Sequence, residues 1–303
     1  MNKSEVVQQY IVKRIKESGI DVPTLEEING FLAEWMQIEN NCPSEHFEGY
    51  SSWDIQQILY NLFDKDCPIQ MADFTNDDCV SVPLFRQTKM LLEYLEQEDT
   101  LKLTQTGNLP TRIVKEMYSV GAPDPHIESG FLNLRIEKDS ISVQMARIAG
   151  ELTKAIKKRN NSLSLTSIGK GLLKDDRKLL LELLTVMFTK FNPAYFDCYS
   201  SENIGVLGTG FNLVLLNKYG EKDQKDAFYS KKYFNAFPML LEEPIVQGES
   251  SMYCYSHRTF NVLLYHLGLV SIEGTNKYSV NHVKLIHKTD LFDRLFKISP
   301  SND

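Results

Sequence analysis

The chain has 303 residues, of which 42% are hydrophobic and 24% charged, with 16 glycines and 11 prolines. This composition is that of a globular protein and excludes a disordered or fibrous one. Five irregularly spaced cysteines argue against a disulfide framework and are typical of a reducing compartment, so we expect a cytoplasmic location. No stretch approaches the roughly 18 uninterrupted apolar residues of a membrane span, so we expect no membrane partner.

The net charge of −7 is unevenly distributed along the chain. Residues 26–100 carry sixteen acidic and three basic side chains, whereas residues 131–190 carry six acidic and twelve basic ones. Opposite potentials on neighbouring segments indicate either docking of one segment on the other or a surface for a polyanion beside an acidic face.

Helix signals predominate in the first hundred residues. Thr24 and Glu27 form a capping box, which predicts a helix from about Leu25 to Gln37. Another helix is expected from Ser51, ending before Pro68, because proline has no amide hydrogen to donate. Pro83 stands where a first helical residue is expected and is followed by LFRQTKMLLEYLEQED.

The pattern L-x-L-T-x-x-G occurs twice, as LKLTQTG at 101–107 and LSLTSIG at 163–169. We interpret it as a repeated unit: a strand with two inward leucines, a threonine at a turn or helix N-cap, and a glycine where a Cβ would obstruct the backbone. A looser version closes the chain, with a helix HRTFNVLLYHL, Gly268 as its cap, and strands at about 268–273 and 277–286. Helix, strand, turn, strand, helix is the order of a winged-helix end.

These blocks carry a resemblance. L-x-L-T-x-x-G followed by a helix resembles the wing exit of winged-helix regulators. The blocks SSWDIQQILYNLF, LKLTQTGNLP and LGLV…HKTDLFDRLF are similar to a family of uncharacterised bacterial proteins, over residues 51–298. This resemblance implies a mostly helical fold and no known activity.

We therefore predict a mostly α fold with short β-strands, arranged as two or three helix–strand–helix, winged-helix-like modules in a helical array. Three domains are expected. Residues 1–100 form an acidic helical domain, residues 101–200 a basic helical domain with both L-x-L-T-x-x-G units, and residues 201–303 a helical domain that ends in the winged-helix-like module.

The helix SISVQMARIAGELTKAIKK is the leading functional candidate, because apolar residues repeat on one face and basic residues on the other. A wing-like strand follows the Asn160–Asn161 turn, which is the order of a recognition helix that enters a groove. The basic set is Arg147, Lys154, Lys157, Lys158 and Arg159. The competing interpretation is an ordinary solvated amphipathic helix.

The function predicted from these features is a non-enzymatic interaction protein that contacts DNA or RNA phosphates through this basic set. The alternative is a protein–protein scaffold that uses the acidic amino-terminal half without nucleic acid. No cofactor is expected. Whether the chain is an enzyme stays open, although its sequence patterns favour a non-enzymatic protein.

Three further sequence patterns each allow both a functional and a structural interpretation. Cys254, His257, His282 and His287 are four potential zinc ligands, although side chains of this kind more often pack or lie on the surface. GVLGTGF, at 205–211, lacks the strand and spacing of a phosphate loop and predicts a flexible or close-packed entry to the next helix. Tyr229, Tyr233 and Phe237 recur at helical spacing, which favours core packing over base stacking.

Overall fold

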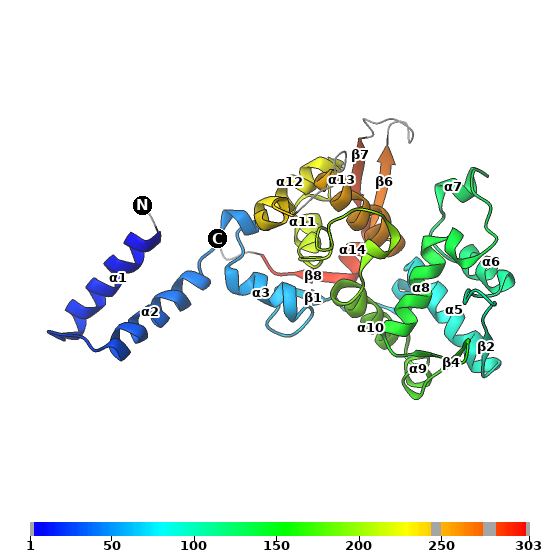
Figure 1. The fold of residues 1–303 in the computed structure, drawn as a ribbon, viewed down its shortest axis with the longest axis horizontal. Helices are drawn as coiled ribbons and strands as arrows, with labels where there is room; N and C mark the ends of the chain where they lie inside the picture. The colour runs from blue at the N-terminus through cyan, green and yellow to red at the C-terminus, as the bar shows by residue number, and fades with distance from the viewer. Residues whose placement is uncertain (1–2, 244–249, 275–282, 301–303) are drawn as a thin grey trace. The chain divides into compact units, whose positions relative to one another are not determined.

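The computed structural model describes residues 3–243, 250–274 and 283–300. Over these ranges the chain is mostly helical, with short antiparallel strands in small sheets, which confirms the predicted fold class (Figure 1). Within the same ranges, no helix has both the length and the apolar character needed to cross a bilayer.

The chain forms two compact units. One contains the residues up to Gln56 together with those from Pro300 on, and the other is Gln57–Ser299. The division into domains at residues 100 and 200 stays a prediction.

The first unit begins with helices α1 (Lys3–Ser18) and α2 (Leu25–Asn40), followed by a short 3₁₀ turn η1 (Glu45–Phe47). The capping box predicted for α2 is present. The Glu27 amide donates to Thr24 Oγ1 at 3.3 Å, and the Thr24 amide donates to Glu27 Oε2 at 2.7 Å. Both sides of the cap are therefore satisfied at the start of this helix. Helix α3 (Ser52–Tyr60) spans the boundary between the units.

The second unit contains a segment that we name the first module. Its elements are α5 (Pro83–Gln97), β2 (Leu101–Lys102), α6 (Thr111–Ser119), α7 (Pro125–Glu128), η2 (Glu137–Asp139), α8 (Ile141–Leu152), β3 (Ile156–Arg159) and β4 (Ser162–Leu165). Pro83 is the first residue of α5, as expected.

A later segment repeats this element order, and we name it the second module. Its elements are α11 (Phe211–Tyr219), β5 (Gln224–Lys225), α12 (Asp226–Ala236), η4 (Pro238–Leu241), α13 (Ser251–Ser256), the π-helical turn η5 (His257–Leu264), β6 (Val270–Gly274) and β7 (Lys284–Lys288). Of the strand predicted at 277–286, residues 277–282 lie outside the described residues.

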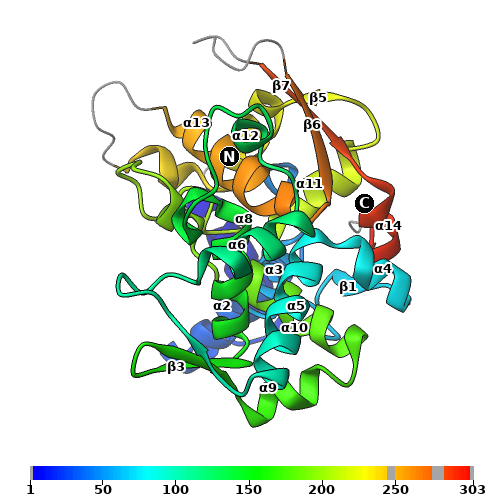
Figure 2. The same cartoon turned by 90° about the vertical axis from the view of Figure 1, so that its right-hand side faces the viewer.

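The two modules share one sheet topology. In each, a short strand after the first long helix pairs with the last strand, so the orders are β2-β4-β3 and β5-β7-β6, all antiparallel. Figures 1 and 2 show the two sheets at opposite ends of the second unit, the first beside α9 (Ser167–Leu172).

The remaining elements connect and close this unit. They are β1 (Ile69–Met71), α4 (Asn76–Ser81), α10 (Asp176–Thr189), η3 (Pro193–Phe196), α14 (Asp290–Leu295) and β8 (Phe296–Ile298). Strand β1 pairs with β8, so the beginning and the end of the unit meet in a two-stranded sheet.

The two L-x-L-T-x-x-G segments are strands of one sheet and not two separate modules, which corrects the repeat interpretation. Leu101 pairs directly with Leu163. The local roles are as predicted for the second segment: Leu163 and Leu165 are buried, and Thr166 caps α9. A Cβ on Gly169 would lie 2.5 Å from the Ala155 carbonyl oxygen, so only glycine fits there.

The sequence predicted one helix over residues 140–158, and this prediction is wrong at the carboxyl end. Helix α8 stops at Leu152, and Lys154 has a φ of +59°, after which residues 156–159 form strand β3. Two hydrogen bonds from Thr166 hold the break: its amide donates to the Ala155 carbonyl at 2.9 Å and its hydroxyl to the Lys154 carbonyl at 2.7 Å. Strand pairing thus overrides the helical pattern.

Core packing by the aromatic side chains of α12 is confirmed. Tyr229, Tyr233 and Phe237 are all buried. The glycine-rich segment before α11 is also close-packed, because a Cβ on Gly208 would lie 2.5 Å from the Phe237 ring.

Candidate nucleic-acid interface

The predicted basic set is divided between a buried helix and an exposed hairpin. Arg147 lies on α8 and is 9% exposed, whereas Lys154, Lys157, Lys158 and Arg159 are all exposed. The last three belong to β3 and not to the helix. A single basic helical face is therefore absent from this described segment.

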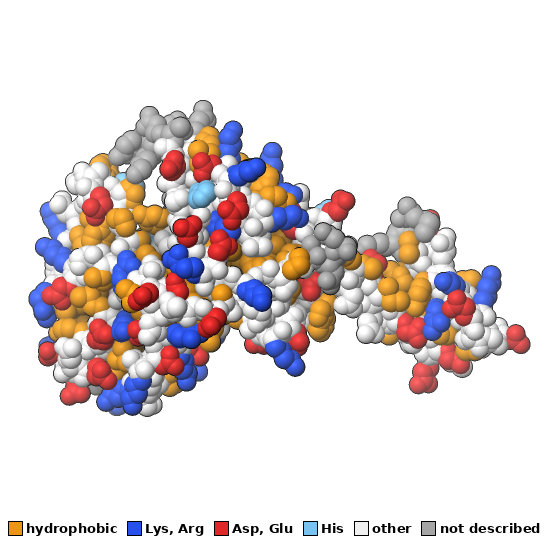
Figure 3. All heavy atoms as spheres, turned by 180° about the vertical axis from the view of Figure 1, so that it is seen from behind, with side chains coloured by type: hydrophobic (Ala, Val, Ile, Leu, Met, Phe, Trp, Pro, Cys, Tyr) orange, Lys and Arg blue, Asp and Glu red, His pale blue; other side chains and the backbone are white. Residues whose placement is uncertain are grey.

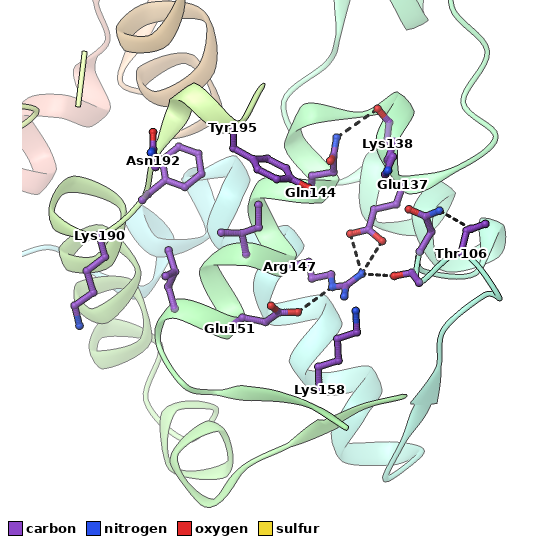
Figure 4. Close-up of a pocket in the computed structure, with 15 residues that line it drawn as sticks. Thr106, Glu137, Lys138, Gln144, Arg147, Glu151, Lys158, Lys190, Asn192 and Tyr195 are labelled. Atoms are coloured by element: carbon purple, nitrogen blue, oxygen red, sulfur yellow. Dashed lines mark hydrogen bonds and ion pairs between the residues drawn. The ribbon is translucent and has the colours of Figure 1, made fainter. Parts of the chain in front are cut away.

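Every residue of helix α8, Ile141–Leu152, is buried or half-buried. Its half-buried residues Gln144, Ile148 and Glu151 line a hollow of about 520 Å³. The opposite wall of this hollow includes Lys190, Asn192 and Tyr195 (Figure 4). A helix that reads the major groove must expose the side chains that reach the bases. The observed packing therefore argues against the recognition-helix role that we expected for α8.

Arg147 is held by internal acceptors. Its Nη1 donates to Glu137 Oε2 at 2.9 Å and to the Gly107 carbonyl at 3.0 Å, and its Nε donates to Glu151 Oε1 at 3.0 Å (Figure 4). Glu137 also accepts a hydrogen bond from the Leu109 amide at 2.7 Å. This side chain fastens α8 to the loop after β2, so its guanidinium group is engaged within the protein.

Strand register divides the first sheet into an inner and an outer face. Residues paired directly across antiparallel strands share a face. Leu101, Leu163 and Lys158 form one such row, and the two leucines are buried. The next row is Lys102, Ser162 and Arg159, and it lies on the opposite face because side chains alternate along a strand.

The outer face of this sheet carries three cations and two serines. Lys102, Lys157 and Arg159 are exposed, and their strand partners are Ser162 and Ser164. Within the described part of the chain, none of these three cations has an ion-pair or hydrogen-bond partner. We name this surface the basic sheet face.

The surroundings of the basic sheet face are also positively charged. Lys154 precedes β3, and Lys170 and Lys174 lie exposed on and after α9. Lysine and arginine side chains gather along the lower edge of this unit in Figure 3, the end at which β2, β4 and α9 lie in Figure 1.

Lys102 was missed by the sequence interpretation, because nothing local connects it with residues 157–159. Its partner Ser162 is sixty positions further along the chain. The available signal was the repeated L-x-L-T-x-x-G: if the two copies had been read as paired strands, Lys102 would have fallen on the face opposite the inward leucines.

The acidic amino-terminal half makes internal ion pairs with later segments. Arg177 Nη2 lies 2.6 Å from Asp73 Oδ1, and Arg294 Nε lies 2.7 Å from Asp78 Oδ1. Some of the acidic residues of the amino-terminal half are therefore neutralised by basic residues of later segments within the second unit.

The predicted zinc ligands do not form a described cluster. Cys254 is buried in α13, and His287 Nδ1 lies 3.3 Å from Asp223 Oδ1. His282 lies outside the described residues. In the part of the chain that the structure covers, no three His, Cys, Asp or Glu side chains are placed to hold a metal ion.

Buried and half-buried titratable groups occur in the second module. Burial lowers the pKa of His257, and the nearby Lys284 ammonium lowers it further. Burial also lowers the pKa of His266 and of Lys284. The Lys284 ammonium donates to Asn261 Oδ1 at 2.7 Å and to Ser256 Oγ at 3.1 Å.

Comparison of the chain with protein-family models, with curated proteins and with solved structures gave no match. The geometry of the chain is therefore the basis for any functional assignment.

Proposed function

We propose that this chain is an interaction protein that binds nucleic acid through the basic sheet face of the first module. The observation that carries the proposal is the set of three exposed, unpaired cations on one face of a small sheet: Lys102, Lys157 and Arg159. Like charges held on one face repel each other, and phosphates remove that repulsion.

The topology of the module supports this proposal. Helix, strand, two helices and a two-stranded hairpin, with sheet order first-third-second, is the arrangement of a winged helix. In such a module the hairpin, called the wing, contacts backbone phosphates beside the helix. Because α8 is largely buried, the proposed contact is between the wing sheet and the phosphates, without base readout. The resemblance to a family of bacterial proteins with such modules stays a hypothesis.

The test is fluorescence anisotropy of labelled duplex DNA and of single-stranded RNA across a salt series, with wild type beside the triple variant Lys102→Ala/Lys157→Ala/Arg159→Ala. Each phosphate contact on duplex DNA contributes about 0.9 to the slope of log K against log salt. We expect the triple variant to bind weakly and to lose a slope of about 2 to 3.

The matched control is Lys222→Ala/Lys225→Ala/Lys231→Ala, which removes three exposed lysines from the second module and changes the net charge by the same amount. This control is expected to keep most of the wild-type affinity. If both triple variants lose affinity equally, binding is set by net charge and not by the basic sheet face. If wild type binds neither probe at low salt, the proposal fails and the protein-scaffold alternative takes its place.

A further inference from the structure

The helical hairpin formed by α1 and α2 lacks a core of its own. The two helices are joined by ion pairing, with Arg14 Nε 2.9 Å from Glu34 Oε2. No residue of α2 is buried, and no described side chain of α1 is buried.

Such a hairpin is too small to be stable alone. Each helix has 16 residues, and helices of this length are marginal in water without tertiary packing. Assemblies of about 40 residues or fewer need oligomerisation, a metal or disulfides to fold. The described residues of the hairpin form no metal site and no disulfide. Burial of its apolar side chains against a partner is therefore the remaining way to stabilise it.

Apolar side chains are available for that burial. The half-buried apolar side chains of the two helices include Ile11, Ile28 and Trp35. Other apolar side chains of the two helices are exposed: Val12 is 51% exposed, Leu25 77% and Met36 50%. A partner that covers the hairpin would bury both groups.

Charge indicates what the partner is. Helix α1 has four basic and two acidic residues, whereas α2 has four acidic residues and no basic one. Two copies of the hairpin can therefore place each α1 against the α2 of the other copy, with opposite charges facing. A two-fold axis makes this contact twice, which is the usual geometry of a homodimer.

We propose that the α1–α2 hairpin is a self-association element that pairs with a second copy of itself into a four-helix bundle. Each α1 lies against the partner copy's α2, and Val12, Leu25 and Met36 become buried in the contact. The proposal does not depend on the nucleic-acid function of the basic sheet face.

The test measures the mass of the full-length protein by light scattering and sedimentation across a concentration series. The expected mass at high concentration is twice 34.8 kDa. Met36→Lys places a charge in the apolar contact, and we expect it to weaken dimerisation about tenfold or more.

The matched control is Met239→Lys in the second unit, where the methionine is 55% exposed. This variant is expected to dimerise as wild type does. A wild-type monomer at all concentrations overturns the proposal. A dimer that Met36→Lys leaves intact, or that Met239→Lys weakens equally, also overturns it, because the interface then lies elsewhere.

Charge pairing is tested with Lys16→Glu and Glu26→Lys, two exposed residues without ion-pair partners among the described side chains. Each variant alone should dimerise more weakly, and an equimolar mixture should recover the dimer as a heterodimer. A mixture that does no better than its components overturns the arrangement of α1 against the partner's α2.

Discussion

In the first module the outer row of the sheet consists of Lys102, Ser162 and Arg159, and in the second module the row at the same register consists of Lys225, Leu285 and Glu273. The inner positions remain apolar at the centre of both sheets, where Leu163 and Ile286 are each 0% exposed. The topology and the inner face are thus shared, and the outer face is free to change. The first sheet has concentrated positive charge there, while the second carries mixed charge.

Helix α8 of the first module and η5 of the second each hold an arginine, and the two arginines differ in burial. Arg258 of η5 is fully buried, with Nε 2.7 Å from Asp197 Oδ2 and two further bonds to the Ser201 and Ile204 carbonyls. The Arg147 side chain is 11% exposed. Both arginines fasten a helix to a preceding loop, but only the Arg258 side chain is wholly removed from water.

The largest effect is expected from Arg258→Ala. Removing this arginine leaves the Asp197 carboxylate buried without its cation, which costs about 3 to 5 kcal/mol in free energy of unfolding. Arg147→Ala should cost less, about 1 to 3 kcal/mol, because Glu137 keeps its hydrogen bond from the Leu109 amide. Urea unfolding measures both changes.

The control is Arg112→Ala, because its ion pair with Glu116 is on the surface and should change stability by no more than about 0.5 kcal/mol. One result would restore the original interpretation of α8: unchanged stability of Arg147→Ala together with a large loss of nucleic-acid affinity. Arg147 would then contact phosphate.

The next largest effect is expected on DNA affinity. It is tested by substitutions that make the outer face of each sheet more like that of the other. Ser162→Glu places a carboxylate between Lys102 and Arg159, so we expect about tenfold weaker DNA binding and a salt slope smaller by about 1. Glu273→Lys removes the acidic residue from the second sheet and should raise affinity slightly. Anisotropy titrations at two salt concentrations measure both.

Ser271→Glu is the control for the added carboxylate, since Ser271 lies on the outer face of the second sheet. It should leave DNA binding nearly unchanged. Equal losses from Ser162→Glu and Ser271→Glu would show that the two sheets do not differ in function.

The smallest effect is on pH dependence, and it concerns the second module. The pKa values of His257 and His266 are lowered by burial, so both rings stay neutral in the folded protein where the unfolded chain protonates. The unfolded state then binds more protons, and the free energy of unfolding falls as pH drops below about 6.5. The slope approaches about 1.4 kcal/mol per pH unit for each histidine until its folded pKa is reached.

Urea unfolding at pH 7, 6 and 5 measures this slope. His257→Gln should reduce it, whereas His46→Gln, at an exposed residue of the first unit, should leave it unchanged. A slope that His257→Gln does not reduce would mean that this ring is not held neutral by the second module.

The sequence predicted what local chemistry determines. The Thr24–Glu27 capping box, the start of α5 at Pro83 and the burial of the α12 aromatics each depend on residues within a few positions, and each is confirmed. Strand β5 was missed because it has only two residues, Gln224 and Lys225, which is too short for an alternating pattern.

The candidate site was harder to predict because it depends on distant contacts. No glycine or proline marks the end of α8, and the left-handed position is occupied by Lys154. The break is stabilised from Thr166, twelve residues further on. Likewise, the acceptors of Arg147 include Gly107, forty positions earlier, so helical periodicity could not show that this arginine is engaged.

The turn between β3 and β4 has two residues, Asn160 and Asn161, with φ values of +50° and +55°. A two-residue turn of this kind fixes the pairing of its strands, and a shift of one position would turn Lys157 and Arg159 inward. Insertions or deletions in this turn should therefore be rejected during evolution, while single substitutions on the outer face are tolerated. The charge of the outer face can therefore change one residue at a time, whereas the length of the hairpin cannot.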